Sequence, residues 1–264
     1  MISSDSNAQV KELVKLQKNA RERRKKQLFI SEGIKLTKEA ALYGKLEKIY
    51  VAESFYEKAE ETVKQWIEEY PYEEVADTVF SGISETVTPQ GILGLVKMPS
   101  YHLEEILNDE RKSIILLDDL RDPGNLGTIM RTAEGAGMSG VVMSRGSVDL
   151  FNPKVVRSTM GAIFRVPFYY ADDLAEVIEQ TKAKGIPVYG TMMQGSVVYD
   201  EPDYCTGAGI VIGNEANGLS QEVIGHLTGA VRIPMEGNLE SLNAAVSAAI
   251  LMYEITRQKR KKLS

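Results

Sequence analysis

Asparagine, arginine, glutamate and serine side chains stand in three glycine-rich stretches of the second half of the chain. These are LDDLRDPGNLGTIMRTAEGAG at 117–137, IVIGNEANGLS at 210–220 and VRIPMEGNLESLNAAVSAAI at 231–250. Each begins in or beside an apolar run typical of a buried strand and opens into a polar turn. Polar turns at the ends of buried strands are where α/β proteins form ligand sites, so we expect a binding site there.

The first stretch offers Asn125 and Arg131 as candidates for contact with a ligand. Its proline and glycines predict a sharp turn after a strand, followed by a helix from Thr128. Arg131 then lies one turn into the helix, on the same side as Asn125. Arginine at such a position suits a phosphate or a developing negative charge. The alternative is a surface arginine paired with Asp122 or Glu134.

The second and third stretches contribute a carboxylate and further polar side chains. Glu215 follows a five-residue apolar strand, where a carboxylate is costly unless it is hydrogen-bonded. Its alternative role is to cap a neighbouring helix or to pair with an arginine. Ser241 and Asn243 lead into a helix of small residues at 244–249, which permits close helix packing within the chain or between subunits.

Strands and helices must position these turns, and they alternate along the second half of the chain. We expect strands at 113–120, 140–144, 164–170, 185–192, 207–214 and 230–235, and helices at 128–136, 153–160, 173–184, 220–227 and 242–257. Near-continuous apolar strands that alternate with helices predict a parallel sheet covered on both faces.

The first 98 residues predict a smaller α/β unit. Helices are expected at 10–24, 34–43 and 56–70 and a helix entry at 84–90, with strands at 28–33, 46–53 and 72–80 and an apolar segment at 91–97. We therefore predict an N-terminal domain at 1–98, a linker at 99–112 and a C-terminal domain at 113–264.

Composition narrows the class of protein. With 43% hydrophobic and 26% charged residues, the chain has the balance of a globular domain. A single cysteine, Cys205, excludes an internal disulfide, and with only two histidines we expect no metal site. There is no apolar run of bilayer length and no signal-peptide pattern, so we expect no membrane partner and a cytoplasmic location.

The net charge of −6 argues weakly against nucleic-acid binding, but the charges are unevenly distributed. Residues 11–48 hold twelve lysines or arginines against five acidic residues. Such a run is either a solvated face or a local phosphate-binding surface, and charge alone favours neither, because counterion release needs only a basic patch.

Together the three stretches identify the chain as similar to the SpoU branch (TrmH-like) of the SPOUT RNA methyltransferases. The motifs are NLGTIMRTAEGAG, IGNEANGLS and IPMEGNLESLNAAVS, in the family's order. KNARERRKKQLFISEGIKLTKEA is similar to the start of the substrate-binding domain that precedes the catalytic domain in many members. The resemblance implies transfer of a methyl group from S-adenosylmethionine to a ribose 2′-hydroxyl of RNA, and an α/β catalytic domain tied in a trefoil knot. It also implies a homodimer formed through the C-terminal domain.

The resemblance also implies roles for residues. Gly213, Ile233 and Leu242 match positions that hold the cofactor mainly through backbone groups, and Thr191 and Met192 resemble a further part of that pocket. Five residues match the polar positions around methyl transfer: Asn125, Arg131, Glu215, Ser241 and Asn243. The resemblance suggests Arg131 as the activator of the hydroxyl. Because a guanidinium stays protonated, our hypothesis is that Arg131 of the partner subunit holds the adjoining phosphate and stabilises the oxygen as an alkoxide forms. Six residues of the N-terminal domain are expected to bind RNA: Lys18, Arg21, Arg23, Arg24, Lys25 and Lys26. Asn214 and Ala216 depart mildly from the family pattern.

Ribosomal RNA of the large subunit is the expected substrate, since a separate N-terminal domain is present. The alternatives are a transfer-RNA methyltransferase of the same branch and an RNA-binding or ribosome-assembly factor that has lost catalysis. A nucleotide-dependent oxidoreductase is disfavoured, because the chain lacks the GxGxxG pattern and the ribose-binding acid that should follow it.

Overall fold

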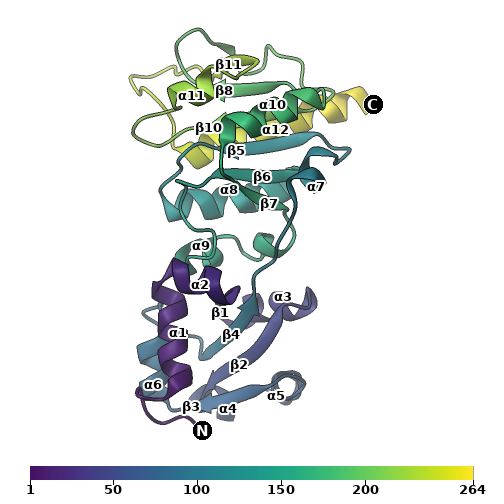
Figure 1. Cartoon of the computed structure of the whole chain (residues 1–264). Coiled ribbons are helices and arrows are strands. Elements are labelled where there is room, and N and C mark those ends of the chain that lie inside the picture. The colour runs from purple at the N-terminus through teal and green to yellow at the C-terminus, as the bar shows by residue number, and fades with distance from the viewer. Residues whose placement is uncertain (264) are drawn as a thin grey trace. The chain divides into compact units, whose positions relative to one another are not determined.

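The computed structural model describes residues 1–263, and the chain divides into two compact units. The first unit comprises residues 1–99 and 149–164, and the second comprises 100–148 and 165–264. Figure 1 shows the helices and strands of both units. Among the described residues, no helix is long and apolar enough to span a membrane.

The first unit contains a four-stranded sheet in the order β1-β4-β2-β3. Its strands are β1 (Leu28–Glu32), β2 (Leu46–Ala52), β3 (Tyr72–Val75) and β4 (Ile92–Lys97). β4 runs antiparallel to β1 and β2, whereas β2 and β3 are parallel. Alternate residues of β2 belong to two different hydrophobic cores. Ile49 and Val51 pack in one core, and Tyr50 and Ala52 pack in the other. Both faces of this sheet are therefore covered by helices.

Helices α1 (Ala8–Lys18) and α6 (Asp77–Ile83) pack on one face of this sheet. Helices α3 (Ile34–Leu42), α4 (Glu53–Lys58) and α5 (Glu61–Glu68) cover the other. The expected helix at 10–24 is two helices, because Asn19 ends α1 and its side chain accepts hydrogen bonds from Arg21 and Glu22, which start α2 (Ala20–Lys26). The strand expected at 72–80 ends at Val75, and the helix expected at 56–70 is divided into α4 and α5.

Residues 149–164 pack in the first unit, although the predicted C-terminal domain includes them in the sequence. They form α9 (Pro153–Ser158) and a 3₁₀ turn η1 (Ala162–Phe164). Phe29 of β1 lies 5.1 Å from Phe151 and 6.1 Å from Phe164, measured between ring centroids. Burial of these aromatic rings holds the segment there.

The second unit contains a seven-stranded sheet in the order β7-β6-β5-β10-β8-β11-β9, and all its pairings are parallel. Its strands are β5 (Ser113–Leu117), β6 (Gly140–Ser144), β7 (Phe168–Ala171), β8 (Val188–Thr191), β9 (Val197–Val198), β10 (Ala208–Ile212) and β11 (Gly229–Arg232). The predicted parallel sheet is confirmed, and β9 is a strand that the sequence pattern did not reveal.

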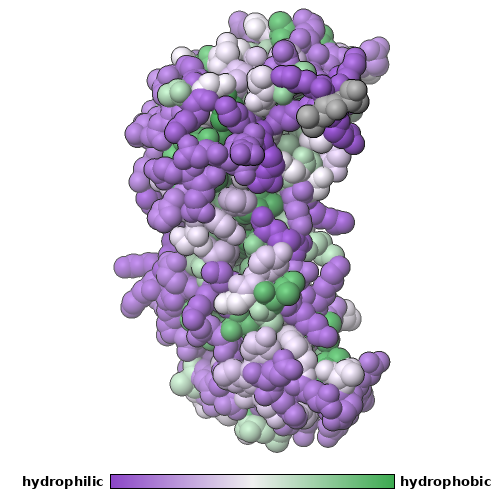
Figure 2. Space-filling model, turned by 90° about the vertical axis from the view of Figure 1, so that its right-hand side faces the viewer, coloured by the Kyte–Doolittle hydropathy of each residue, from purple (hydrophilic) through white to green (hydrophobic). Residues whose placement is uncertain are grey.

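One face of the seven-stranded sheet is covered by α8 (Pro123–Gly135) and α12 (Ala244–Leu263), which pack against each other. The other face carries α7 (Leu103–Leu107), α10 (Leu174–Ala183) and α11 (Gln221–Ile224). The expected linker at 99–112 thus contains α7, whose Leu103, Ile106 and Leu107 belong to the core of the second unit. The face of the molecule in Figure 2 is mostly hydrophilic, with small, separated hydrophobic areas.

Candidate active site

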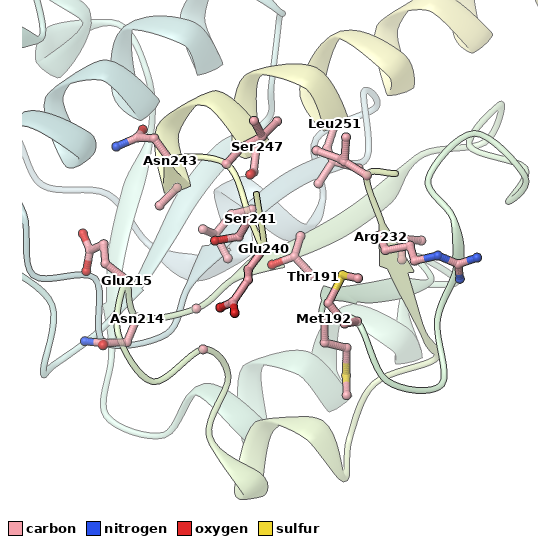
Figure 3. Close-up of a pocket in the computed structure, with 18 of the residues that line it drawn as sticks. Thr191, Met192, Asn214, Glu215, Arg232, Glu240, Ser241, Asn243, Ser247 and Leu251 are labelled. Atoms are coloured by element: carbon pink, nitrogen blue, oxygen red, sulfur yellow. The ribbon is translucent and has the colours of Figure 1, made fainter. Parts of the chain in front are cut away.

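A pocket of about 530 Å³ lies at the carboxyl ends of β8, β10 and β11 in the second unit. Its walls come from the loops that follow these three strands and from the first turns of α12 (Figure 3). All five residues expected to hold the cofactor line it: Thr191, Met192, Gly213, Ile233 and Leu242. Glu215, Ser241 and Asn243 also line it. The second and third stretches therefore contribute to one pocket, whose lining contains no residue of the first stretch.

Gly213 lets the loop after β10 fold tightly upon itself. A Cβ atom at this position would lie 2.4 Å from the backbone carbon of Gly218 and 2.7 Å from the backbone nitrogen of Leu219. The two residues flanking the turn, Asn214 and Gly218, exchange backbone hydrogen bonds of 2.9 Å. Any side chain at position 213 would push apart the backbone segments that shape this wall of the pocket.

Glu215 is held by hydrogen bonds from the loop that follows β5 and from the first turn of the helix after it. Its carboxylate accepts from the backbone N–H of Arg121 (3.2 Å) and of Asp122 (3.0 Å) and from the side-chain amide of Asn125 (2.9 Å). Asn125 Oδ1 in turn accepts from Nδ2 of Asn243 at 2.9 Å. These hydrogen bonds connect Glu215, Asn125 and Asn243 in series, so they join one residue from each of the three stretches.

These hydrogen bonds also determine the ionisation of Glu215. Partial burial by itself would raise the pKa of this carboxyl, but the amide of Asn125 and the backbone N–H groups around it outweigh burial. The pKa of Glu215 therefore lies below its ordinary value, and the group is an anion at neutral pH. The alternative reading, a carboxylate paired with an arginine side chain, does not fit, since Arg121 reaches Glu215 only through its backbone.

Asn214 links the same loop to Asp119. Its side-chain amide donates to the backbone carbonyl of Asp119 at 2.9 Å, and its Oδ1 accepts from the backbone N–H of Ala216 and Asn217. Asp119 has a left-handed backbone conformation, with φ of +58°. The residue that departs from the family pattern thus stabilises both turns at this edge of the sheet.

The position of Arg131 corrects one expectation. Helix α8 begins at Pro123, not Thr128, because the side chain of Asp122 caps it by accepting from the backbone N–H of Asn125 (2.7 Å). Asn125 is therefore inside the first turn and buried at 8% exposure, whereas Arg131 lies on the exposed side of the helix. The two side chains do not share a face, as the 100° rotation per residue requires.

Neither of the surface ion pairs considered for Arg131 is present. Glu134 binds Arg165, and Asp122 caps α8. Within residues 1–263 no hydrogen bond or ion pair holds the Arg131 guanidinium. This arginine is therefore available to a ligand or to another chain.

Glu240 and Ser247 are two pocket residues to which the sequence analysis gave no role. Figure 3 shows the carboxylate of Glu240 inside the pocket, below Ser241 and between Asn214 and Thr191. A carboxylate here gives the cavity an anionic group besides Glu215. Arg232 also borders the pocket, but its guanidinium points away and donates to the backbone carbonyl of Ser196. The position of Glu240 within the third stretch is the sequence feature that could have identified it as a pocket residue.

Five of the six basic residues predicted to bind RNA are exposed on α1 and α2: Lys18, Arg21, Arg24, Lys25 and Lys26. Arg23 is the exception and corrects the prediction, since it is only 3% exposed. Its guanidinium donates to the backbone carbonyls of Leu16 (2.6 Å) and Gln17 (2.7 Å) and to Asp149 (3.0 Å). Arg23 therefore fastens α1, α2 and the 149–164 segment together and has no surface to offer a phosphate.

Few groups in the chain could bind a metal ion. Within residues 1–263 no three histidine, cysteine, aspartate or glutamate side chains gather as ligands. Nδ1 of His226 lies 2.9 Å from Glu179, and His102 precedes the first turn of α7. Cys205 is a free thiol whose pKa is raised by its hydrogen bond with Asp203.

A pocket bounded by loops at the carboxyl ends of parallel strands defines an α/β protein that binds a small organic ligand. Residues 112–253 match the SpoU rRNA Methylase family, and residues 7–94 match the MRM3-like substrate binding domain. The chain belongs to the SpoU rRNA methylase family. This confirms the resemblance found in the three motifs and the predicted class of enzyme, an RNA methyltransferase that uses S-adenosylmethionine.

Individual relatives resemble the chain along nearly its whole length. The 23S rRNA (guanosine(2553)-2′-O)-methyltransferase RlmP of Bacillus subtilis is 36% identical over 255 residues, 96% of this chain and 98% of its own. The AdoMet-bound rRNA methyltransferase of Sinorhizobium meliloti has a TM-score of 0.85 at 32% identity, covering 97% of each chain. The SpoU methyltransferase AviRb of Streptomyces viridochromogenes, in complex with AdoMet, has a TM-score of 0.85 at 25% identity, covering 97% of this chain and 100% of its own.

The pocket fits S-adenosylmethionine in both size and chemistry. A volume of about 530 Å³ lies within the range of roughly 300–1,000 Å³ that is usual for cofactor-sized ligands. Apolar walls from Ile212, Ile233 and Leu251 suit the adenine ring. Glu240 offers a negative charge to a ligand that carries a sulfonium and an ammonium group.

Proposed function

We propose that this protein methylates a ribose 2′-hydroxyl in large-subunit ribosomal RNA, with S-adenosylmethionine as the donor. The observation that carries the proposal is the single pocket to which the second and third motifs contribute, with Asn125 of the first motif hydrogen-bonded to both Glu215 and Asn243 in its wall. Similarity to a 23S rRNA methyltransferase along both units supports ribosomal over transfer RNA. Such a substrate also supports a cytoplasmic location.

Thr191, Met192, Gly213, Ile233 and Leu242 would hold the cofactor. When bound, S-adenosylmethionine supplies a methyl group on a cationic sulfur, an electrophilic carbon. The protein has to orient the ribose oxygen and stabilise it as it loses its proton. The hydrogen-bonded chain from Glu215 to Asn243 fixes the loops around that position and carries out no proton transfer itself.

Arg131 would stabilise the negative charge that develops on the ribose oxygen and hold the adjoining phosphate. A guanidinium remains protonated in proteins, so it acts as a fixed positive charge and not as a base. Its exposed position on α8, without a partner among the described residues, supports contact with a group outside this chain. Arg131 is thus assigned to the RNA and not to the cofactor.

The proposal extends to a homodimer formed through α12. Val246 and Tyr253 lie on one side of this helix and are 47% and 49% exposed, with Ala249 and Ile250 half-buried between them. An apolar stripe at this spacing is suited to pack against another helix. Next to it, the Tyr253 hydroxyl lies close to Gly135 of α8, where an added Cβ would be 3.3 Å away. A second copy on this face would bring its own Arg131 close to the pocket.

Combining Arg131→Ala, which impairs turnover, with Gly213→Ala, which impairs cofactor binding, tests whether Arg131 acts from the partner subunit. The assay uses a concentration of S-adenosylmethionine too low to occupy the Gly213→Ala pocket. Arg131→Ala and Gly213→Ala chains are co-expressed with different tags, and heterodimers are purified by both tags. If Arg131 completes the site of the other subunit, each heterodimer contains one site in which an intact pocket meets an intact arginine. The heterodimer should then have up to half of the wild-type activity per dimer. Light scattering that shows a monomer at micromolar concentration would contradict the dimer.

We also propose that the polypeptide is threaded into a trefoil knot around this pocket. The residues that line the pocket fall within 191–193, 212–218 and 231–251, which are well separated in the sequence, and the last of these segments includes the first turns of α12. A crystal structure in which α12 passes outside the preceding loops would contradict the knot.

A methylation assay on separated RNA pools tests the proposed function. The purified chain is incubated with S-adenosylmethionine labelled in the methyl group and with 23S rRNA, 16S rRNA or tRNA from cells that lack the gene. The 23S rRNA is expected to become labelled, and the label should be found in a 2′-O-methyl nucleoside after digestion. Label in tRNA alone would favour the tRNA alternative, and no label in any pool would favour a factor that has lost catalysis.

A further inference from the structure

A second pocket, of about 470 Å³, lies in the first unit on residues that none of the motifs includes. It is formed by the end of β2 and α4, by α6, and by the segment that leads into β4. The residues used below are Ser54, Phe55, Lys58, Asp77, Gln90 and Gly91. We propose that this pocket binds one unpaired guanine base of the RNA, at a nucleotide other than the one that is methylated. The proposal rests on the proposed function and adds a means of substrate selection to it.

Phe55 and Gly91 form the apolar wall of the pocket. Gly91 has a φ of +86°, which favours glycine, and an added Cβ would lie only 2.5 Å from Cβ of Phe55. The carbonyl of Gly91 accepts a hydrogen bond from Ala52 at 2.8 Å, which fixes the segment against the end of β2. Glycine here lets the backbone press against Phe55, which is half-buried and leaves part of its side chain to the pocket. Aromatic side chains in RNA-binding domains stack on unpaired bases in this way.

The polar groups of the pocket offer a carboxylate as acceptor and a side-chain amide N–H as donor to such a base. Oδ1 of Asp77 accepts from the backbone N–H (3.2 Å) and the hydroxyl (2.9 Å) of Ser54. Within residues 1–263 no hydrogen bond reaches its other oxygen, Oδ2. Gln90 accepts from the N–H of Ile34 (3.2 Å) through Oε1, so its amide nitrogen remains a potential donor.

This arrangement favours guanine over the other three bases. On its pairing edge guanine presents two adjacent N–H donors, suited to a carboxylate, beside a carbonyl oxygen, suited to an amide N–H. Adenine and cytosine each present one amino group next to a ring nitrogen whose lone pair would face the carboxylate, and uracil presents a single N–H between two carbonyl oxygens. Lys58, which is exposed at the same pocket, supplies a positive charge for the phosphate of the bound nucleotide. The carboxylate disfavours a free phosphate as the occupant.

Short single-stranded probes test the proposal with the full chain. Fluorescein-labelled heptauridylates that carry G, A, C or U at the central position are titrated, and binding is followed by anisotropy. We expect the G probe to bind about tenfold more tightly than the U probe. Asp77→Asn should reduce this preference to below about threefold, because the amide still accepts from Ser54 but no longer offers two acceptor oxygens. Equal affinities for all four probes would overturn the proposal.

Matched variants separate recognition of the base from charge and folding. Glu61→Gln makes the same charge change at an exposed site of α5 outside the pocket, and it should retain the preference for G. Phe55→Leu should weaken binding of every probe by about fivefold or more through loss of stacking, and a melting temperature close to that of the wild type shows that the unit is folded. A preference for G that persists in Asp77→Asn would place recognition elsewhere and contradict the proposal. If the chain methylates 23S rRNA but binds the four probes without any preference for G, the proposal for this pocket alone is refuted. If the chain methylates no RNA, the proposed function is refuted.

Discussion

The loops at the carboxyl edge of the seven-stranded sheet and the basic surface of α1 and α2 hold their charged groups in opposite ways. Glu215 accepts two backbone and one side-chain hydrogen bonds from a neighbouring loop. Lys18, Arg21, Arg24 and Lys25 are exposed at helix ends. Methyl transfer needs a fixed geometry, which hydrogen bonds from the backbone provide, whereas attraction of RNA needs only charge. The two regions should therefore respond differently to substitution.

Removal of the guanidinium at Arg131 should have the largest effect on activity. We expect Arg131→Ala to lower the turnover number by about 10²–10³, the usual loss when a group that stabilises a developing anion is deleted. Affinity for S-adenosylmethionine should be unchanged, since Arg131 does not line the pocket. Single-turnover methylation and calorimetry measure the two quantities, and Thr128→Ala, also exposed on α8, is the control. Turnover at the wild-type rate would remove Arg131 from the mechanism.

Two adjacent arginines should separate stability from RNA binding within the first unit. Arg23→Ala leaves Asp149 without its buried partner and should cost about 3 kcal/mol of unfolding free energy, measured in urea. Arg24→Ala should change stability by less than about 0.5 kcal/mol. It should instead lower the salt dependence of RNA binding by about one unit of slope. Equal free energies of unfolding for the two variants would contradict the assignment of Arg23 to stability and of Arg24 to RNA binding.

A methyl group added at Gly213 should act on the cofactor and leave RNA binding unchanged. In Gly213→Ala the new Cβ would overlap the backbone of Gly218, so the loop after β10 must move. We expect affinity for S-adenosylmethionine to fall by about tenfold or more. Gly225→Ala serves as the control, because a Cβ there would meet no atom closer than 3.6 Å. Unaltered cofactor binding would mean that this loop does not shape the site.

The smallest effect is a dependence of stability on pH at Glu215. Its pKa is lower in the folded chain than the ordinary value of about 4.3, so its ionisation stabilises the fold above that pH. This contribution is lost as the pH falls through the lowered pKa. Glu215→Gln should therefore be less stable than the wild type at pH 7, by about 1 kcal/mol or less because the residue is exposed and its interactions are screened by solvent. The difference should shrink below about pH 4. Denaturant titrations at pH 7 and pH 3.5 measure it, and a difference that grows in acid would contradict the assignment.

The sequence predicted the fold best where apolar runs were continuous. The strands around 113–117, 140–144 and 208–212 carry few polar residues, and their pattern alone indicates a parallel sheet. In the first unit short elements meet without glycine or proline, so local patterns merged α1 with α2 and β3 with α6. The two-residue strand β9 has no periodicity at all. Boundaries of this kind depend on capping and packing that a local pattern does not contain.

Most of the pocket residues could be predicted because they stand in the second and third motifs, whereas the burial of a side chain could not be predicted. Arg23 stands in a run of basic residues, and nothing local distinguishes it from Arg24. Its burial depends on Asp149, which is 126 positions away in the sequence. The face occupied by Arg131 was misjudged because the start of α8 was placed at Thr128 instead of Pro123. With the start of the helix placed five residues too late, Asn125 was expected in the turn before the helix. It is instead a helical residue, and the rotation of 100° per residue places it on a different face from Arg131.

Calorimetric titration of the purified chain with S-adenosylmethionine measures occupation of the pocket in the absence of RNA. Saturable binding of one molecule per chain is expected, with a marked loss of affinity in Gly213→Ala and none in Gly225→Ala. If the wild-type chain gives no binding heat at any temperature examined, or binds the cofactor equally well as Gly213→Ala, the pocket described here is not the cofactor site.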